Sequence, residues 1–499
     1  MKSALLALTA LVSASGLVAQ TAPVSTPSSN LSSAPAASNP VTFSLFLRER
    51  TNATEWFAAT PNPETYGHQD SMLRIGISQK IKAWDYMLEL GQSAELGLPT
   101  DAVSTVAAQG QLGLGGTYYA SNSNNQYPAA ASFRQGYARY HFKGDADTLR
   151  IGRFEFFEGQ EMTQKNPALA WLQTNRIAQR LIGNFGFSNG QRSFDGVESR
   201  LGGNNWNLTA FGGRATQGVF NMNANPELNV DIQSLAYTRL IAKERIIVRG
   251  FGIGYHDGRT GLTKTDNRTA AARALDHKNI RIGTYGGDLV AALPAGGNTI
   301  DFVLWGAGQF GTWGLIDHRA GAVAVEGGLR FDKTRTSPWI RGGYWRSTGD
   351  NNNTDGVHNT FFQIAPTPRV YARFPFYNLM NSTDSFVQIV DKPSRKLDLR
   401  TDMHFLKLTA PGDFWYQGGG AFDNKVFGFT GRPGSGVGTS GSFSSLYDFS
   451  GDYAMTSQLS LGMYYAHAFG KTVVGNIYTT HRNANYGYFE LTYKLQKKL

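Results

Sequence analysis

The chain has 499 residues, no cysteine, 58 glycines and a formal net charge of +10 at pH 7. Its mean hydropathy is −0.31, and beyond the first residues no segment approaches about 18 consecutive apolar residues. These values exclude a bundle of membrane-spanning helices.

The N-terminus has the order of regions found in secretory signal peptides. Met1 and Lys2 precede an apolar run over residues 4–12, and small residues follow through Ala19. The apolar run is shorter than the roughly 20 residues that a single membrane anchor needs. We therefore predict a signal peptide over residues 1–19, with cleavage after Ala19 or Ala22, and export from the cytoplasm.

A tract rich in Pro, Ser, Ala and Thr follows over residues 20–40 and contains no charged residue. Such a tract cannot bury enough apolar surface to fold, so we predict a flexible linker. No second tract of this kind follows, and residues 41–499 are predicted to form a single domain.

Apolar and polar residues alternate in many segments of this domain. The clearest is Leu397–Leu408, where one face carries Leu, Met and Phe while the other carries Asp, Arg and His. Residues 73–78 and 452–469 alternate in the same way. This period is typical of a transmembrane strand that faces lipid on one side and a polar lumen on the other. Counting such segments gives about 16 to 20. We predict an all-β fold, a single antiparallel transmembrane β-barrel of about 18 strands (16 to 18) with long extracellular loops.

Turn residues separate these segments, in clusters at residues 122–125, 189–190, 202–205 and 349–355. The last segment has the pattern of the final strand of an outer-membrane barrel, although the chain ends in Gln-Lys-Lys-Leu without the usual terminal aromatic residue. One face of that segment carries Gly487, Phe489, Leu491, Tyr493 and Leu495. The structural alternative is a soluble exported β-sandwich, which at this length would normally split into domains.

Arginine recurs at strand positions, namely Arg74, Arg150, Arg153, Arg200, Arg249, Arg330, Arg341 and Arg400. An arginine on the lipid face at mid-bilayer costs roughly 2 to 4 kcal/mol, so we expect these side chains to face the lumen or the rims. A barrel of this size holds an aqueous channel, and guanidinium groups on its wall attract anions.

The alternative role for these arginines is structural. Asp398, Asp402 and Glu326 are acidic residues that would pair with some of them. Arg150 and Arg153 also have opposite strand parity. One of these two must lie at a strand end, at a bulge near Gly152, or on the outer face.

Residues 166–180 are less strand-like than their surroundings and would form a short helix. Arg176 and Arg180 are four residues apart and would share one face of it. Such a segment would fold into the lumen as a constriction, or it would lie in a surface or periplasmic loop.

Other motifs carry little weight. Residues 186–190 fit the Gly-x-Ser-x-Gly pattern but read as a turn, without the strand-to-helix context of a hydrolase. The histidines show no metal-ligand spacing, and His404 is expected to make a hydrogen bond in the lumen. The Asn and Asp residues at 350–355 are ordinary turn chemistry, with a calcium loop as the alternative. We expect no enzyme activity, metal site or cofactor.

Two stretches resemble the signature stretches of the alginate export family of outer-membrane channels. They are residues 149–156 (LRIGRFEF), with Gly159 following, and residues 192–197 (RSFDGV). Residues 347–350 and 359–362, together with Asn381, resemble a third stretch. The resemblance implies an 18-stranded monomeric barrel with an arginine-rich constriction for a polyuronate chain. It carries over most directly to Arg150, Arg153, Arg192 and Asp195. Glu155 departs from the family, which often has Gln there, and an acid beside a pore arginine would let a different solute pass.

Together these patterns predict an outer-membrane channel that passively transports an anionic solute through an arginine-lined lumen. An acidic polysaccharide such as alginate is the expected solute. A general or phosphate-type anion porin is the alternative, and an outer-membrane enzyme or a structural or adhesive barrel is the other class. The expected partners are the anionic polysaccharide or oligosaccharide, outer-membrane lipids and periplasmic export or uptake components, without nucleic acid. The residues predicted to bind solute are Arg74, Arg150, Arg153, Arg192, Asp195, Arg330 and Arg400.

Overall fold

The computed structural model describes residues 39–59, 65–367, 370–432 and 440–499. It is a closed 18-strand antiparallel barrel with only 7% helix, which confirms the predicted fold class. The predicted signal peptide over residues 1–19 and most of the linker lie outside the described residues.

Each barrel strand pairs with the next along the chain, and the first strand closes the barrel by pairing with the last. The barrel strands are β1 (Thr42–Glu55), β2 (Thr65–Ile81), β3 (Trp84–Leu96), β4 (Ala129–Lys143), β5 (Asp147–Phe154), β6 (Phe194–Gly203), β7 (Trp206–Thr216), β8 (Glu227–Ile241), β9 (Ile246–Asp257), β10 (Ile280–Ala295), β11 (Asn298–Trp313), β12 (Ile316–Arg330), β13 (Trp339–Ser347), β15 (Ser382–Ser394), β16 (Leu397–Leu408), β19 (Ser442–Ala454), β20 (Leu459–Gly470) and β21 (Asn483–Lys498).

The alternation of side chains explains why these residues form barrel strands. In β8, Leu235 and Tyr237 on the outer face are exposed, whereas Ser234, Ala236 and Thr238 on the inner face are buried. Apolar side chains face outward because lipid accepts them, and small or polar side chains face the lumen. Along the paired stretches, backbone polar groups bond to the neighbouring strand, and closure of β1 on β21 leaves no free sheet edge.

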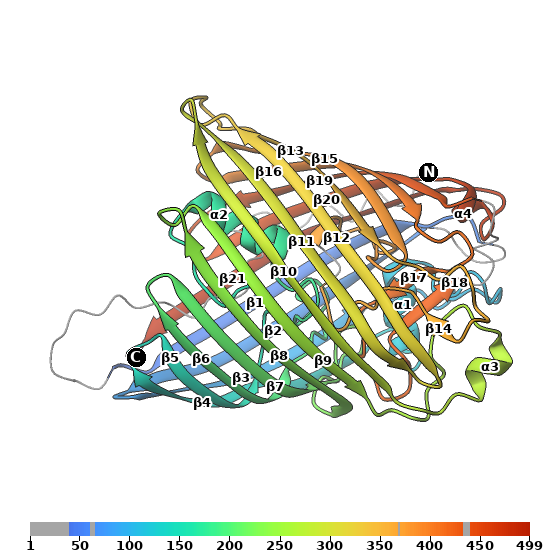
Figure 1. Cartoon of the computed structure of the whole chain (residues 1–499), viewed down its shortest axis with the longest axis horizontal. Helices are drawn as coiled ribbons and strands as arrows, with labels where there is room; N and C mark the ends of the chain where they lie inside the picture. The colour runs from blue at the N-terminus through green and yellow to red at the C-terminus, as the bar shows by residue number, and fades with distance from the viewer. Residues whose placement is uncertain (1–38, 60–64, 368–369, 433–439) are drawn as a thin grey trace.

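The two ends of the barrel differ. Short turns join strands at one end, and longer connections gather at the other. These connections carry α1 (Gly113–Ser121), α3 (Ala270–Ala274), α4 (Thr472–Gly475), β14 (Val357–His358) and the small hairpin of β17 (Trp415–Gly418) and β18 (Phe429–Arg432), all towards the right of Figure 1. In outer-membrane barrels the long-loop end is extracellular. No helix within the described ranges is long and apolar enough to cross a membrane.

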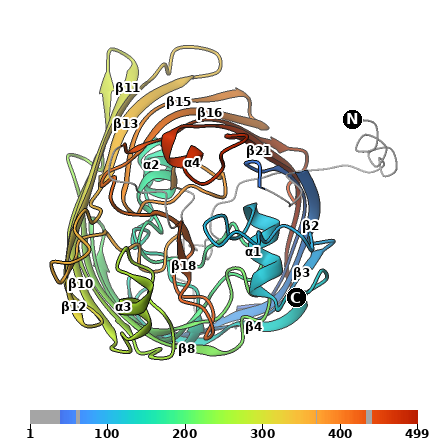
Figure 2. The same cartoon turned by 90° about the vertical axis from the view of Figure 1, so that its right-hand side faces the viewer.

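One long connection, residues 155–193 between β5 and β6, folds inside the ring of strands (Figure 2). It contains α2 (Pro167–Leu172) and the π-helix η1 (Gln173–Ile177). Asn166 begins α2 because its side chain accepts a hydrogen bond from the Ala168 amide at 2.9 Å. Of the two alternatives for residues 166–180, the structure places them within the barrel, in what we call the inner segment (residues 155–193).

Candidate functional site: the arginines of the lumen

Wall arginines anchor the inner segment through carboxylates. Arg74 on β2 donates to Glu155 at 3.0 Å and also bonds to Gln191. On the opposite side of the segment, Arg249 on β9 donates to Glu158 and Glu161, each at 2.8 Å. Arg74, predicted to bind solute, therefore holds the inner segment against the wall.

Other wall arginines anchor the same segment through its backbone carbonyls. Arg48 on β1 donates to the carbonyls of Gly186 at 2.8 Å and Ser188 at 3.0 Å. Arg134 on β4 donates to the carbonyl of Gly190 at 2.9 Å. The Ser188 hydroxyl itself donates to the Phe185 carbonyl at 3.1 Å, in keeping with a turn at this point.

The helical part of the inner segment is tied to β11–β13. Arg176 donates to Glu326 at 2.7 and 3.0 Å, and Arg341 donates to the same carboxylate at 3.2 Å. Arg180 lies over the rings of Trp305 and Trp345. All of these side chains are fully buried. The pairing foreseen as an alternative for Glu326 is therefore present.

A different arrangement lies on the lumen side of β4, β5 and β6, towards the short-turn end. Arg150 contacts Glu198 at 2.6 Å, and Arg200 contacts the same carboxylate at 2.7 Å. Arg139 lies within electrostatic range of Glu198 and is bonded to Asp85 at 2.8 Å. Three guanidinium groups thus face two carboxylates, and we call Arg139, Arg150 and Arg200 the basic cluster.

Arg330 and Arg400 lie on other parts of the wall. Arg330 is bonded to Asp332 at 2.6 Å and lies over the Trp339 ring. Arg400 donates to Asp402 at 2.5 Å and to the Tyr371 carbonyl at 2.5 Å. The side chains of Arg330 and Arg400 are 26% and 19% exposed, so both remain accessible to a solute.

Arg192 is a buried cation of another kind. It donates to the carbonyls of Ala421, at 3.2 Å, and Gly419. Within the described ranges, no carboxylate forms an ion pair with it. Burial lowers the pKa of Arg192 to about 9. Arg192 therefore joins the inner segment to the connection between β16 and β19.

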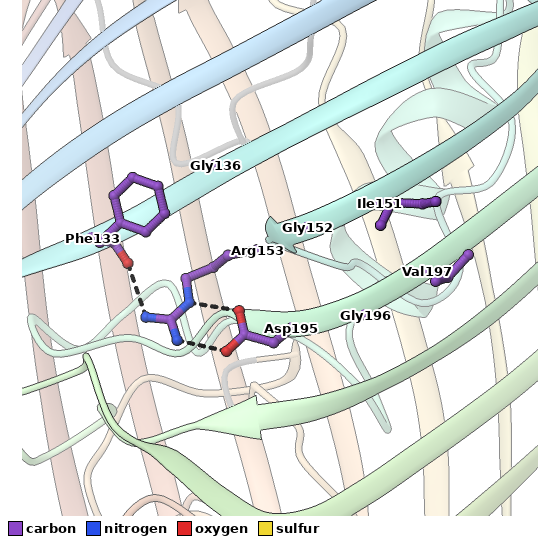
Figure 3. Close-up of a pocket in the computed structure, with 8 residues that line it drawn as sticks. All are labelled: Phe133, Gly136, Ile151, Gly152, Arg153, Asp195, Gly196 and Val197. Carbon is purple, nitrogen blue, oxygen red and sulfur yellow. Dashed lines mark hydrogen bonds and ion pairs between the residues drawn. The ribbon is translucent and has the colours of Figure 1, made fainter.

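Arg153 and Asp195, both predicted to bind solute, point away from the lumen (Figure 3). They pair with each other at 2.7 and 2.5 Å beside Phe133, Ile151 and Val197, which are exposed on the outer surface. The register through Gly152 is regular, so the opposite parity of Arg150 and Arg153 is resolved by placing Arg153 on the outer face. Arg153 and Asp195 consequently do not line the lumen.

Several functional candidates were absent from the sequence prediction. Arg139 is one, although its alternation with the outward Ala138 and Tyr140 is a signal that would have found it. Arg48 and Arg134 are two others. Nothing local marks them as anchors, because their partners lie 138 and 56 residues away in the chain.

The geometry has a counterpart among solved structures. OccAB2 of Acinetobacter baumannii has a TM-score of 0.58 at 9% identity, covering 92% of this chain and 98% of that one. OpdO of Pseudomonas aeruginosa has a TM-score of 0.52 at 10% identity, covering 92% and 97%. OpdK of P. aeruginosa, solved with vanillate, has a TM-score of 0.53 at 9% identity, covering 92% and 99%. At such low identity these likenesses show the fold alone.

The sequence comparison is more specific. No match was found among curated protein sequences. A model of the alginate export family, by contrast, matches residues 105–489, which is most of the barrel and includes the inner segment and the basic cluster. The chain therefore belongs to the alginate export family and is an outer-membrane β-barrel channel.

Proposed function

We propose that this channel passes an anionic solute, an acidic polysaccharide or its oligosaccharides such as alginate, along the basic cluster of its lumen. The observation that carries this proposal is the convergence of Arg139, Arg150 and Arg200, whose three positive charges face Glu198 and Asp85 among the described residues. Guanidinium groups match carboxylates in a two-pronged geometry and attract them strongly where water is partly excluded.

Arg330 and Arg400 extend this path on the facing walls, where their guanidinium groups are accessible. A polyuronate carries a carboxylate on each sugar and would exchange one arginine contact for the next as it moves. Multiple weak sites favour passage because no single site holds the chain too tightly. Membership of the alginate export family supports the same class of solute.

A small carboxylate or phosphate is the second candidate, and a specific observation favours it. The inner segment occupies part of the lumen and is held by buried ion pairs such as Arg176–Glu326. A narrowed lumen suits a small anion better than a polymer. One solved protein of similar fold, OpdK, was crystallised with vanillate, a small carboxylate.

Single-channel recording separates these candidates. The protein is placed in planar bilayers under a salt gradient, and oligouronates, neutral oligosaccharides of matched length and a small carboxylate are added in turn. We expect anion preference and blockade by oligouronates but not by the neutral sugars. Arg150→Gln with Arg200→Gln should weaken that blockade about tenfold to a hundredfold, as expected for charged hydrogen bonds worth about 1.5 to 3 kcal/mol.

Arg153→Gln is the matched control, because it removes the same group from the outer face of the same strand. It should leave the blockade unchanged. Cation preference, or equal blockade by charged and neutral sugars, would overturn the proposal. Passage of the small carboxylate without blockade by oligouronates would establish the second candidate.

Export belongs to the same proposal. Residues 1–19 would be removed as a signal peptide, leaving residues 20–40 as a linker before the barrel. N-terminal sequencing of the protein from outer membranes should begin at Gln20 or Pro23, and an intact Met1 would contradict it.

A further inference from the structure

Four titratable side chains gather on the lumen wall at β15, β16 and β19. Asp402 and His404 lie two residues apart on β16 and so share one face. Asp448 on β19 is the direct register partner of Asp402, and Asp384 on β15 contacts His404. All four side chains are buried.

The protein pairs few cations directly with the carboxylates of this group. Asp402 and Asp448 stand directly opposite each other, an arrangement of like charges that destabilises a strand pair. Arg400 is bonded to Asp402 at 2.5 Å. Among the ion pairs of the described residues, it is the only arginine paired with this group, and Arg176 lies within electrostatic range of Asp402.

His404 is oriented as metal-binding histidines are. Its Nδ1 lies 2.7 Å from Asp384 Oδ2, and since an ionised carboxylate only accepts, Nδ1 carries the proton. In the neutral ring, which a bound cation would select, Nε2 then presents a lone pair. It is buried, and no hydrogen-bond partner for it exists among the described residues. A carboxylate that fixes one ring nitrogen and frees the other is the usual support of a histidine ligand.

From this geometry we propose that Asp402, His404 and Asp448 bind one divalent transition-metal cation, with Zn²⁺ as the probe. One ligand atom from each residue lies within 4.8 Å of the others, a spacing that small side-chain rotations bring to bonds of about 2.0 to 2.2 Å. An imidazole with two carboxylates suits Zn²⁺ or Mn²⁺, whereas Ca²⁺ prefers oxygen alone.

The surrounding donors support this assignment. Gln388 donates to Asp402 at 2.5 Å, Tyr464 donates to Asp448 at 3.0 Å, and Tyr377 donates to Asp384 at 2.6 Å. These contacts fix the carboxylates in place, as the outer ring of donors around a metal does.

A second buried trio, His68, Asp70 and Glu95 on β2 and β3, provides a matched comparison. There Arg50 contacts Asp70 at 3.2 Å. No carboxylate hydrogen bond orients the His68 ring among the described residues: Nε2 lies 3.5 Å from Asp70 Oδ1 and 3.9 Å from Glu95 Oε2, and Nδ1 has no hydrogen-bond partner there. We therefore assign the metal to the His404 site and use His68 as the control.

The test measures bound zinc. Full-length mature protein, folded in detergent, is stripped with a chelator, dialysed against dilute Zn²⁺ and analysed for zinc per protein. We expect one Zn²⁺ per chain. His404→Gln should abolish this binding and His68→Gln should preserve it, with Asp384→Asn weakening the affinity about tenfold to a hundredfold by releasing the His404 ring.

Folding of each variant is checked by the heat-dependent gel mobility of the barrel. Should His404→Gln fail to fold, Asp448→Asn tests the same site. Wild-type protein without stoichiometric zinc, retention of zinc by His404→Gln, or its loss in His68→Gln would each overturn the proposal. The readout is metal content, so its outcome is independent of which solute the channel passes.

Discussion

The paired strands β5 and β6 carry an arginine–carboxylate pair on each of their two faces. Arg150 and Glu198, 2.6 Å apart, face the lumen, whereas Arg153 and Asp195, 2.5 Å apart, face outward. The two pairs have the same chemistry and lie three residues apart in sequence. Because residues three positions apart on a strand lie on opposite faces, the two pairs have different surroundings.

The difference lies in what surrounds each pair. The inner pair has Arg139 and Arg200 beside it, so its surroundings are rich in positive charge. The outer pair has Phe133 and Val197 beside it and lies next to the loop end of β5, where the cost of charge near the membrane interface is small. Under the proposed function, an arginine that faces the lumen either binds solute or holds the inner segment.

The largest loss of stability is expected from removing Glu326, a lumen carboxylate that holds the inner segment. Glu326→Ala leaves Arg176 and Arg341 buried without their shared partner. Breaking a buried ion pair in this way should lower the free energy of unfolding by about 3 to 5 kcal/mol. Chemical denaturation measures the loss. Glu244→Ala, which removes an exposed pair with Lys165, should cost almost nothing.

A smaller effect on stability, with a larger one on selectivity, is expected from Glu198→Gln. Removing this carboxylate deprives Arg150 and Arg200 of a charged hydrogen bond, at a cost of about 2 kcal/mol. The cluster becomes more positive, so the anion-to-cation permeability ratio from reversal potentials should rise. An unchanged ratio would place the conducting path away from this wall.

A carboxylate that is buried without an arginine partner should make the stability of the protein depend on pH. Asp413, in the connection between β16 and β19, accepts hydrogen bonds from Thr360 at 2.5 Å and Tyr416 at 2.7 Å. Burial raises the pKa of Asp413 to about 6. The folded form therefore binds a proton more tightly than the unfolded one, so this group lowers stability as pH rises from about 4 through about 6, and its effect then levels off.

The free energy of unfolding should drop by about 1 kcal/mol between pH 5 and pH 7.5 because of this group. Denaturation at both pH values measures the drop, and Asp413→Asn should remove this part of it. If the free energy of unfolding of the variant drops as much between these pH values as that of the wild type, groups other than Asp413 cause the pH dependence.

The sequence was sufficient for the barrel because its information is local. Alternation along a strand such as Leu397–Leu408 sets which face meets lipid, and a closed antiparallel barrel then satisfies every strand edge. Alternation also allowed three positions for Arg153: a strand end, a bulge near Gly152, or the outer face. The sequence could not choose among them, because parity alone does not show whether Gly152 interrupts the register.

The side-chain contacts inside the lumen could not be predicted from the sequence, because they join residues far apart in the chain. The partner that makes Arg176 an anchor, Glu326, is 150 residues away. Nothing near Arg74 or Arg192 distinguishes an arginine that holds a segment from one that meets a solute. Only the folded position of residues 155–193 separates the two roles.

The smallest change in stability is expected from variants of the outer pair, Arg153 and Asp195. These variants test the comparison of the inner and outer pairs most directly. Arg153→Gln should lower the free energy of unfolding by less than about 1 kcal/mol, since the pair is partly exposed and lies near the membrane interface. Joint replacement of Arg153 and Asp195 by leucine should be neutral or stabilising, because apolar side chains suit a lipid-facing surface. Reversal potentials should not move in either variant. A shift in selectivity as large as that expected for Glu198→Gln would mean that Arg153 faces the lumen, and the assignment of faces along β5 would then be inverted.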